Sequence, residues 1–304
     1  MGINNYAAAP GITPGATSYF SAPSSELDPK LFVGDEMRIS MKEGILSILF
    51  NYLSRNFNDP YRWTKAWLAG SGVSYQWAAS RSPGDLDCLV GIEYTKFRQK
   101  NPEYTGYSDS EIAAMFNENF SASIMPNTRN WEGYELTYYV NPATDIREIN
   151  PYAAYDLIAD DWTVKPSKNT TAPYSREWEQ KAQRDYDMAA EILNRHNQAI
   201  NELRSTTNPA YRVNAERKIK LVQDQAASVY DEIHHGRRIA FSQMGAGYAD
   251  FHNYRWQAGK KSGAIQALRT IKDQRDLRNK AEQADTYGVE LPTASTLIRR
   301  SLRS

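Results

Sequence analysis

The sequence has few of the features that form disulfides, span membranes or direct secretion. Its 304 residues include one cysteine, Cys88, which excludes an internal disulfide and suits a reducing compartment. The most apolar stretch, from Gly44 to Leu53, is shorter than a membrane span and contains Ser47 and Asn51. The first residues lack the charged start and apolar middle of a secretory signal. We therefore expect a soluble, cytoplasmic protein with no membrane partner.

Charge of either sign is missing from the first 25 residues, which are rich in Ala, Gly, Pro and Ser. This composition predicts a flexible N-terminal arm, residues 1–25. Elsewhere a net charge of zero conceals a gradient. Residues 1–163 carry 12 Lys and Arg against 20 Asp and Glu (−8), residues 164–233 carry 11 against 10 (+1), and residues 234–304 carry 13 against 6 (+7). This gradient suits an enzyme acting on a phosphate-rich polymer, and a solvated helical surface explains it equally well.

Periodicity divides the remaining chain into two parts. The first part predicts an α+β fold, a small mixed β-sheet flanked by helices, and the second predicts an all-helical C-terminal domain. We place the domain boundaries at 26–163 and 174–290, followed by a basic tail, 291–304. The expected helices are 38–55, 108–119, 152–158, 175–205, 211–235 and 250–283. A capping box at Ser108 begins the second, Gly236 ends the fifth, and Gly259 and Gly263 weaken the last. The expected strands are 85–94 and 134–140, and 160–173 is expected to be a linker.

The most informative motif is Gly70-Ser71, followed after thirteen residues by Asp85-Leu86-Asp87. Strand side chains alternate between faces, so Asp85 and Asp87 point the same way while Leu86 and Cys88 point into a core. Two neighbouring carboxylates repel each other, and a divalent cation between them relieves the repulsion. Hard oxygen ligands favour magnesium. The alternative is a strand edge beside a turn with two solvated acids.

Gly-Ser, a helix-compatible segment and Asp-x-Asp on an apolar strand, in that order, resemble the signature of the polymerase-beta-like nucleotidyltransferase superfamily. The resemblance covers roughly residues 38–150. It implies that Gly70 and Ser71 hold nucleotide phosphates at a helix start, and that Asp85 and Asp87 bind Mg²⁺ in a two-metal site that Mn²⁺ can also fill. It further implies a nucleotidyltransferase-like fold for residues 26–163 and an NTP as partner.

The resemblance also implies a third carboxylate on a neighbouring strand. Glu135 matches best, since it lies mid-strand between Tyr134 and Leu136, which face the other way. An edge strand with Glu135 in solvent is the alternative. Glu93 shares the parity of Asp87 but lies six residues, about 20 Å, along the strand, too far for one metal.

Cationic residues supply further candidates. Arg81 and Ser82 precede the two acids and suit a phosphate or a base, although Arg81 suits an exposed loop equally well. Lys96, Arg98 and Lys100 follow the Asp-x-Asp strand and are either triphosphate contacts or part of a solvated turn. The remaining set, possible substrate contacts on a cationic, aromatic surface, is open to the alternative of a helix end capped by its own side chains: His234, His235, Arg237 and Arg238.

Together these features predict a magnesium-dependent enzyme that moves NMP from an NTP to a hydroxyl on an RNA end, a protein or a small molecule. The basic C-terminal part favours RNA. Three short blocks of sequence are also informative: Asn141-Pro142, His234-His235-Gly236 and Gly247-Tyr248-Ala249-Asp250-Phe251-His252. They resemble nucleotidyltransferases encoded by actinobacterial phages, which would place the protein in the host cytoplasm. The alternatives are a catalytically silent scaffold or virion-associated assembly protein on the same fold, and a nuclease or another magnesium phosphotransferase.

Overall fold

A computed structural model describes residues 6–77, 84–141, 143–168, 173–288 and 292–301. The chain divides into two compact units. The first, here called the helical unit, comprises Met1–Thr17, Ala172–Ala240 and Ala249–Leu291. The second, the sheet unit, comprises Ser18–Thr171, Phe241–Tyr248 and Pro292–Ser304. Each unit is therefore built from three separate stretches of the sequence.

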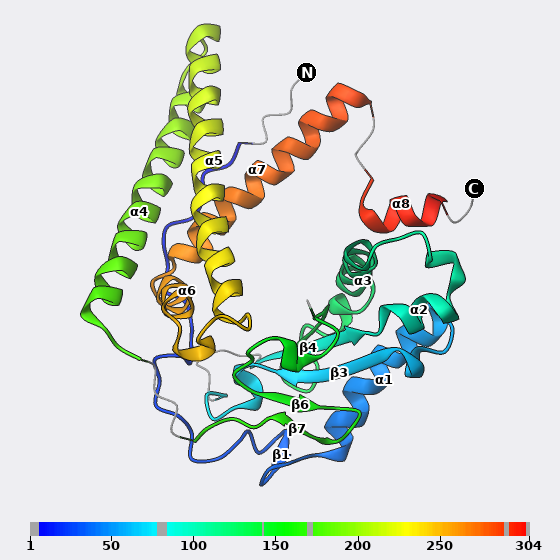
Figure 1. The fold of residues 1–304 in the computed structure, drawn as a ribbon. Coiled ribbons are helices and arrows are strands. Elements are labelled where there is room, and N and C mark those ends of the chain that lie inside the picture. Colours follow the sequence, from blue (N-terminus) through cyan, green and yellow to red (C-terminus); the bar gives the residue numbers. More distant parts are fainter. Residues whose placement is uncertain (1–5, 78–83, 142, 169–172, 289–291, 302–304) are drawn as a thin grey trace. The chain divides into compact units, whose positions relative to one another are not determined.

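The elements follow one another along the chain as labelled in Figure 1. The α-helices are α1 (Ile39–Asn56), α2 (Tyr94–Lys100), α3 (Asp109–Ser123), α4 (Arg176–Ser205), α5 (Pro209–Ala240), α6 (Phe251–Ser262), α7 (Ala264–Tyr287) and α8 (Ala294–Ser301). The strands are β1 (Phe32–Val33), β2 (Glu36–Met37), β3 (Thr64–Ala69), β4 (Gly84–Ile92), β5 (Tyr134–Val140), β6 (Ala154–Asp156) and β7 (Asp161–Val164). Single 3₁₀ turns are η1 (Pro60–Arg62), η2 (Ser71–Val73), η3 (Pro102–Tyr104), η4 (Met125–Asn127), η5 (Ile146–Glu148) and η6 (Gly247–Ala249).

The main sheet has five strands in the order β5-β4-β3-β6-β7. Strand β4 runs parallel to β5, and the other neighbours are antiparallel. Strands β1 and β2 form a separate antiparallel pair. The parallel pair aligns the starts of β4 and β5 at the same edge of the sheet.

One face of the sheet is covered by α1 and α3. Leu86, Cys88 and Val90 of β4 lie in one continuous core with residues of both helices. Among these are Ile45 of α1 and Phe116 of α3, each with no exposed surface. The helices contribute apolar residues at helical spacing, as expected for amphipathic helices packed on a sheet. The opposite face carries a smaller cluster that comprises Trp67, Ala69, Leu89, Ile146 and Ala154.

Most of the elements predicted from local patterns are confirmed. The helix expected over 38–55 is α1, and the helix expected over 108–119 is α3, with the capping box formed between Ser108 and Glu111. The strand expected over 134–140 is β5, and the Asp-x-Asp strand is β4. The fold class, a small mixed sheet with flanking helices, is confirmed as well.

Other expectations are wrong. Residues 152–158 contain strand β6 instead of a helix, and residues 161–164 form β7 where a linker was expected. Strand β6 gains its stability from pairing with β3, and β7 from pairing with β6, a non-local effect that local propensity does not register. Gly236 does not end its helix, because α5 continues to Ala240. The last long helix is broken at Gly263, which adopts a left-handed conformation (φ 87°) between α6 and α7.

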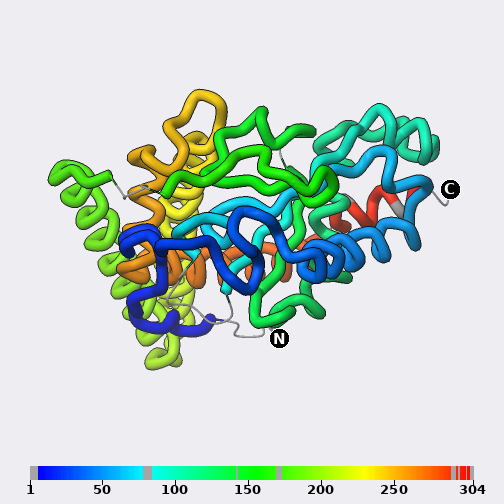
Figure 2. Tube along the Cα trace, turned by 90° about the horizontal axis from the view of Figure 1, so that it is seen from below, coloured from blue at the N-terminus to red at the C-terminus, as the bar shows by residue number. Residues whose placement is uncertain are grey.

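The helical unit consists of α4 to α7 around two separate apolar clusters. Residues 6–17 have no regular secondary structure, and Figure 2 shows this dark-blue arm beside the orange α6–α7 segment. The amide of Asn197 bonds both backbone groups of Ala9, at 2.8 Å to its N–H and 2.9 Å to its carbonyl. Gly263 permits the close approach, since a Cβ there would lie 2.1 Å from the carbonyl oxygen of Thr13. Part of the arm is therefore an ordered component of this unit.

No helix in the described part of the chain is both long enough and apolar enough to cross a lipid bilayer.

Candidate functional site

The pairing of β4 with β5 brings the predicted acids together on one face at one edge of the sheet. Asp85 pairs with Glu135, and Asp87 pairs with Thr137. Register partners on adjacent strands share a face and lie about 4.8 Å apart, so the three carboxylate residues project from the same side. All three are half-buried. Leu86 and Cys88, with opposite parity, are buried in the core, as the alternation predicts.

Thr137 holds one of these acids in place. Its hydroxyl donates to Asp87 Oδ1 at 2.9 Å. Burial, with a smaller contribution from Asp87, raises the pKa of the neighbouring Cys88 thiol far above its usual range. Cys88 is therefore a neutral core residue and not a nucleophile.

The Gly-Ser turn lies against the two aspartates. Gly70 follows β3 with a φ of 87°, and a Cβ built on it would lie 3.8 Å from Asp87 Oδ2. Gly72 is tighter still, since its Cβ would lie 2.5 Å from the carbonyl oxygen of Asp85. Gly70 is therefore favoured by its left-handed backbone conformation, and Gly72 by the close approach of the backbone of Asp85.

Of the helix expected after Gly-Ser, the described residues up to 77 form a 3₁₀ turn over Ser71–Val73, and residues 78–83 lie outside the described part of the chain. Such a short segment has little dipole, so the helix-start argument for phosphate binding loses most of its weight. The exposed position of Ser71 keeps its hydroxyl accessible. Arg81 and Ser82 lie outside the described residues.

The position of Glu135 agrees in part with each of its two predicted settings, a carboxylate beside the two aspartates and an acid on an edge strand. Strand β5 is an edge strand of the sheet, and Glu135 is nevertheless half-buried and in register with Asp85. Glu93 lies beyond the end of β4 and pairs with Lys65 and Lys96. It belongs to a different charge cluster.

The residue types suit a hard divalent cation, but the ligand cage is not preassembled. Within the described residues, no group of three or more His, Cys, Asp or Glu side chains is positioned to hold a metal. Carboxylates on adjacent backbone positions can converge by side-chain rotation, since Asp85, Asp87 and Glu135 share one face. The donor set therefore fits Mg²⁺ or Mn²⁺ in chemistry, and the cation itself would have to draw the carboxylates together.

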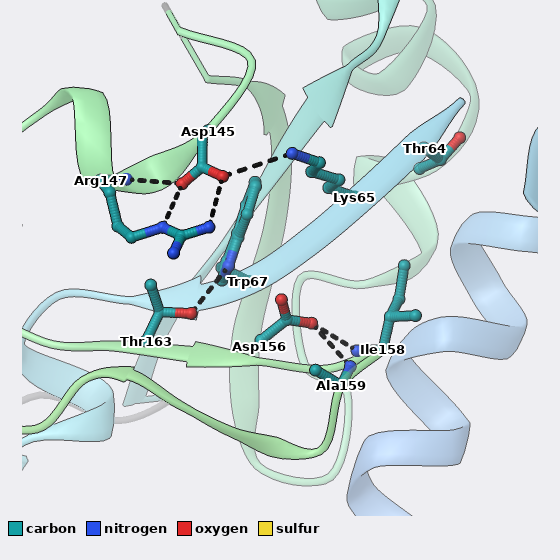
Figure 3. A pocket seen from close by; sticks show the side chains of 9 residues that line it. All are labelled: Thr64, Lys65, Trp67, Asp145, Arg147, Asp156, Ile158, Ala159 and Thr163. Atoms are coloured by element: carbon teal, nitrogen blue, oxygen red, sulfur yellow. Dashed lines mark hydrogen bonds and ion pairs between the residues drawn. The ribbon is translucent and has the colours of Figure 1, made fainter. Parts of the chain in front are cut away.

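A pocket of about 220 Å³ lies on the same face of the sheet, further along β3. Register links the two regions: Ala69 pairs with Asp87, and Trp67 pairs with both Leu89 and Asp156. Figure 3 shows the side chains that line it, from β3, η5 and its N-cap residue, β6, the β6–β7 turn and β7: Thr64, Lys65, Trp67, Asp145, Arg147, Asp156, Ile158, Ala159 and Thr163.

Charges in this pocket compensate one another. Asp145 accepts two hydrogen bonds from the guanidinium of Arg147, at 3.0 and 2.9 Å, and one from Lys65 at 3.3 Å. The bonds from Arg147, followed by those from Lys65, hold the pKa of Asp145 well below its usual range despite partial burial. Asp156 caps the following turn by accepting from the N–H groups of Ile158 and Ala159.

Of the other cationic candidates, those after β4 are occupied by structural partners. Lys96 pairs with Glu93, Arg98 with Asp109 and Lys100 with Asp59. They lie on or near α2, a helix where the sequence suggested a turn.

The His-Arg block on α5 is split between two sides of the helix. His234 and Arg237 are half-buried against Trp256 of α6, while His235 and Arg238 are exposed. The sequence analysis predicted that the four residues form one surface. Their helical spacing indicates two sides instead, because positions 234 and 237, three residues apart, face the same way on a helix.

Sequence reasoning missed Thr137 and the Lys65–Asp145–Arg147 cluster. Thr137 was detectable in principle, since it has the parity of Glu135 on the same strand. The cluster was not, because it depends on η5 folding over β3, which no local pattern encodes.

Comparisons with protein-family models, with curated proteins and with solved structures found no match to this chain.

Proposed function

We propose that this protein is a metal-dependent nucleotidyltransferase that moves NMP from an NTP to a hydroxyl acceptor. The observation that carries the proposal is the parallel register of β4 and β5, which aligns Asp85 with Glu135 beside Asp87. The close approach of Gly72 to the backbone of Asp85 adds to it, since a turn that passes this close to the acids can bring backbone N–H groups to an anion held there.

Each residue has a distinct role in this proposal. Asp85, Asp87 and Glu135 would hold one or two Mg²⁺ ions, which on binding would neutralise developing charge on the phosphates. Thr137 keeps the Asp87 carboxylate oriented through its hydrogen bond, as outer ligands commonly do. Gly70 and Gly72 keep the turn free of side chains where the nucleotide would approach. The acceptor hydroxyl, on an RNA end, a protein or a small molecule, would enter on the same face of the sheet.

The test is transfer of label from each α-labelled NTP, with Mg²⁺, onto RNA and protein from a bacterial lysate. Asp87→Asn should lower transfer at least about a hundredfold, since it removes a metal ligand. Thr137→Val should lower it less, roughly tenfold, because the ligand remains but loses its orienting bond.

Asp156→Asn is the matched control. Asp156 is another half-buried acid on the same face, and Asn keeps the oxygen that caps the turn. We expect it to leave transfer within about twofold of the unmutated chain, because surface polar changes of this kind have small effects. Equal losses in Asp87→Asn and Asp156→Asn would point to a general electrostatic or folding effect and contradict the assignment.

A second candidate is a catalytically silent scaffold or assembly protein. It is favoured by the finding that the described residues contain no preassembled metal-binding group. Absence of variant-sensitive label with any NTP, together with failure of Mg²⁺ or Mn²⁺ to raise the melting temperature, would favour the scaffold over the enzyme.

A further inference from the structure

The interface between α5 and α6 contains an arginine whose environment differs from that of the other half-buried arginines in the helical unit. The guanidinium of Arg237 lies 5.1 Å from the ring centre of Trp256. Arg255, Arg275 and Arg278 each bond an acid or an amide oxygen on a neighbouring helix, and Arg212 donates to backbone carbonyl groups. Among the described residues, Arg237 makes no hydrogen bond or ion pair.

Several buried polar atoms at this interface also lack a partner in the described part of the chain. They are Nε of Arg237, Nε1 of Trp256 and Nδ1 of His252. Buried N–H groups without an acceptor are costly, so an arrangement with two such donors side by side is expected to have an acceptor in its working state. Trp256 is 8% exposed, so its indole cannot readily turn to solvent for one.

Gly236 allows this arrangement in the middle of a helix. A Cβ at this position would lie 2.6 Å from Nδ1 of His252. The glycine therefore lets the imidazole of α6 lie directly against α5, next to Arg237. This close approach offsets the usual cost of a glycine inside a helix.

The local charge is positive. Burial lowers the pKa of His234, and the nearby Arg237 and Arg238 lower it further, while Asp231 opposes them. His234 lies between the rings of Tyr230 and Trp256, at 5.7 and 5.4 Å. Of the acids on this stretch of α5, Glu232 is engaged by Arg255. At the start of α6, Asp250 accepts a bond from the N–H of His252, so the acids at this interface are Asp231, Glu232 and Asp250. The cations nearest His234 are Arg237 and Arg238.

We propose that the Arg237–Trp256–His252 interface is a binding site for a phosphate group. A phosphate oxygen can accept from the guanidinium in the forked geometry that arginine favours, while the indole holds the guanidinium plane from the other side. Arg237 is half-buried, so a ligand can reach part of its side chain from solvent. The site stands on contacts within the helical unit and does not depend on nucleotidyl transfer.

The experiment follows the indole N–H signal of Trp256 by NMR in the full-length ¹⁵N-labelled protein. Seven tryptophans give seven such signals, and Trp256→Phe identifies the relevant one. Titration with inorganic phosphate should shift this signal saturably. Arg237→Gln should weaken the affinity by roughly tenfold to a hundredfold, the range for a lost hydrogen bond to a charged group.

Arg238→Gln is the matched control, because it removes the same charge one residue along the same helix at an exposed position. We expect a loss of about twofold, from the change in local potential alone. Arg237→Lys guards against a folding defect, since it keeps the charge but loses the fork and should fall between the two Gln variants. No shift with phosphate, or equal weakening in Arg237→Gln and Arg238→Gln, would overturn the proposal.

A single-stranded RNA oligonucleotide distinguishes the source of the phosphate. If the RNA competes with phosphate for the Trp256 signal and Arg237→Gln reduces the salt dependence of its binding by about 0.7 in the logarithmic slope, the ligand is a nucleic-acid backbone. If phosphate and pyrophosphate bind but RNA does not, the ligand is a free phosphate compound. In either case Asp87→Asn should bind as the unmutated chain does, which separates this outcome from that of the proposed transfer activity.

Discussion

The sheet unit and the helical unit are held together in different ways. The sheet unit has one large core on one face of its sheet, in which Trp63, Phe97 and Phe116 are fully buried in mutual contact, and a smaller cluster on the other face. The helical unit has two apolar clusters, both smaller than that core, and ion pairs link its helices: Asp185 of α4 with Arg255 of α6, and Asp224 of α5 with Arg275 of α7. Packing of apolar side chains therefore stabilises the sheet unit, while in the helical unit ion pairs help to determine which helix faces meet.

The largest effect is expected from the centre of the aromatic core. Trp63→Ala removes a side chain with no exposed surface, together with the hydrogen bond from its Nε1 to the carbonyl of Asn58. We expect a loss of about 3–5 kcal/mol in the free energy of opening for the amides of β3 and β4, measured by hydrogen exchange.

Tyr61→Ala is the control, since Tyr61 is 72% exposed and only stacks on Phe50. It should cost about 1 kcal/mol. If Trp63→Ala lowers the protection of α4 and α5 as much as that of β3 and β4, the two units open together and the contrast between them fails.

A smaller effect is expected from the ion pairs of the helical unit. Asp185 accepts a bidentate pair of bonds from Arg255, at 2.5 and 2.7 Å, and both side chains are largely buried. Asp185→Asn leaves a partly buried guanidinium short of its charged partner. We expect a loss of about 2–3 kcal/mol in the free energy of unfolding, measured by urea unfolding followed by the circular dichroism of the helices.

Asp224→Asn removes an equivalent acid from a more exposed pair with Arg275, and it should cost no more than about 1 kcal/mol. Equal costs for the two Asn variants would show that burial does not govern these pairs. The contrast between a packed unit and a charge-paired unit would then need another explanation.

How far the sequence predicted this structure depends on how local each feature is. Helices α1 and α3 and strand β5 were predictable because capping residues and apolar spacing lie within the segments themselves. Strands β6 and β7 were not, because such short segments acquire a strand conformation only through pairing, β6 with β3 and β7 with β6. The common face of Asp85 and Asp87 follows from alternation, whereas the bond from Thr137 and the pocket around Asp145 require the register of separate strands and the fold of η5.

The N-terminal arm tests whether the helical unit depends on contacts from outside its helices. Asn197→Ala removes both bonds to the backbone of Ala9, which is itself buried in the apolar cluster. We expect the arm to be released at a cost of about 1–2 kcal/mol, seen as faster proteolysis and faster exchange of residues 6–17. Gln198→Ala, which affects an exposed amide bonded to Glu202, should leave the arm protected. Release in both variants would mean that the arm is held by helix stability and not by the Asn197 amide.

The smallest effect is a dependence on pH that only the helical unit should show. His196 has no exposed surface, and its Nε2 lacks a hydrogen-bond partner in the described part of the chain. Burial disfavours the charged imidazolium and lowers the pKa of His196, against a weaker opposing bond with Asn197. The unfolded chain therefore binds more protons than the folded one below the ordinary histidine pKa of about 6.5. Stability is full above this value and falls as the pH drops from about 6.5 toward the lower folded pKa.

His196→Leu should reduce this dependence and leave the part that comes from His234, whose pKa is also lowered by burial. Leucine fills a similar volume, and the substitution loses only the bond between Nδ1 and Asn197. Melting temperatures of both proteins between pH 7.5 and 5, reported by exchange in α4, provide the measurement. Their difference should shift in favour of His196→Leu as the pH falls, since only the unmutated chain must keep the imidazole of His196 neutral in the core. His235→Gln, at an exposed position on α5, should follow the unmutated chain. An unchanged difference across this range would mean that the folded helical unit admits a charged His196, and that its core is more accessible to water than its packing implies.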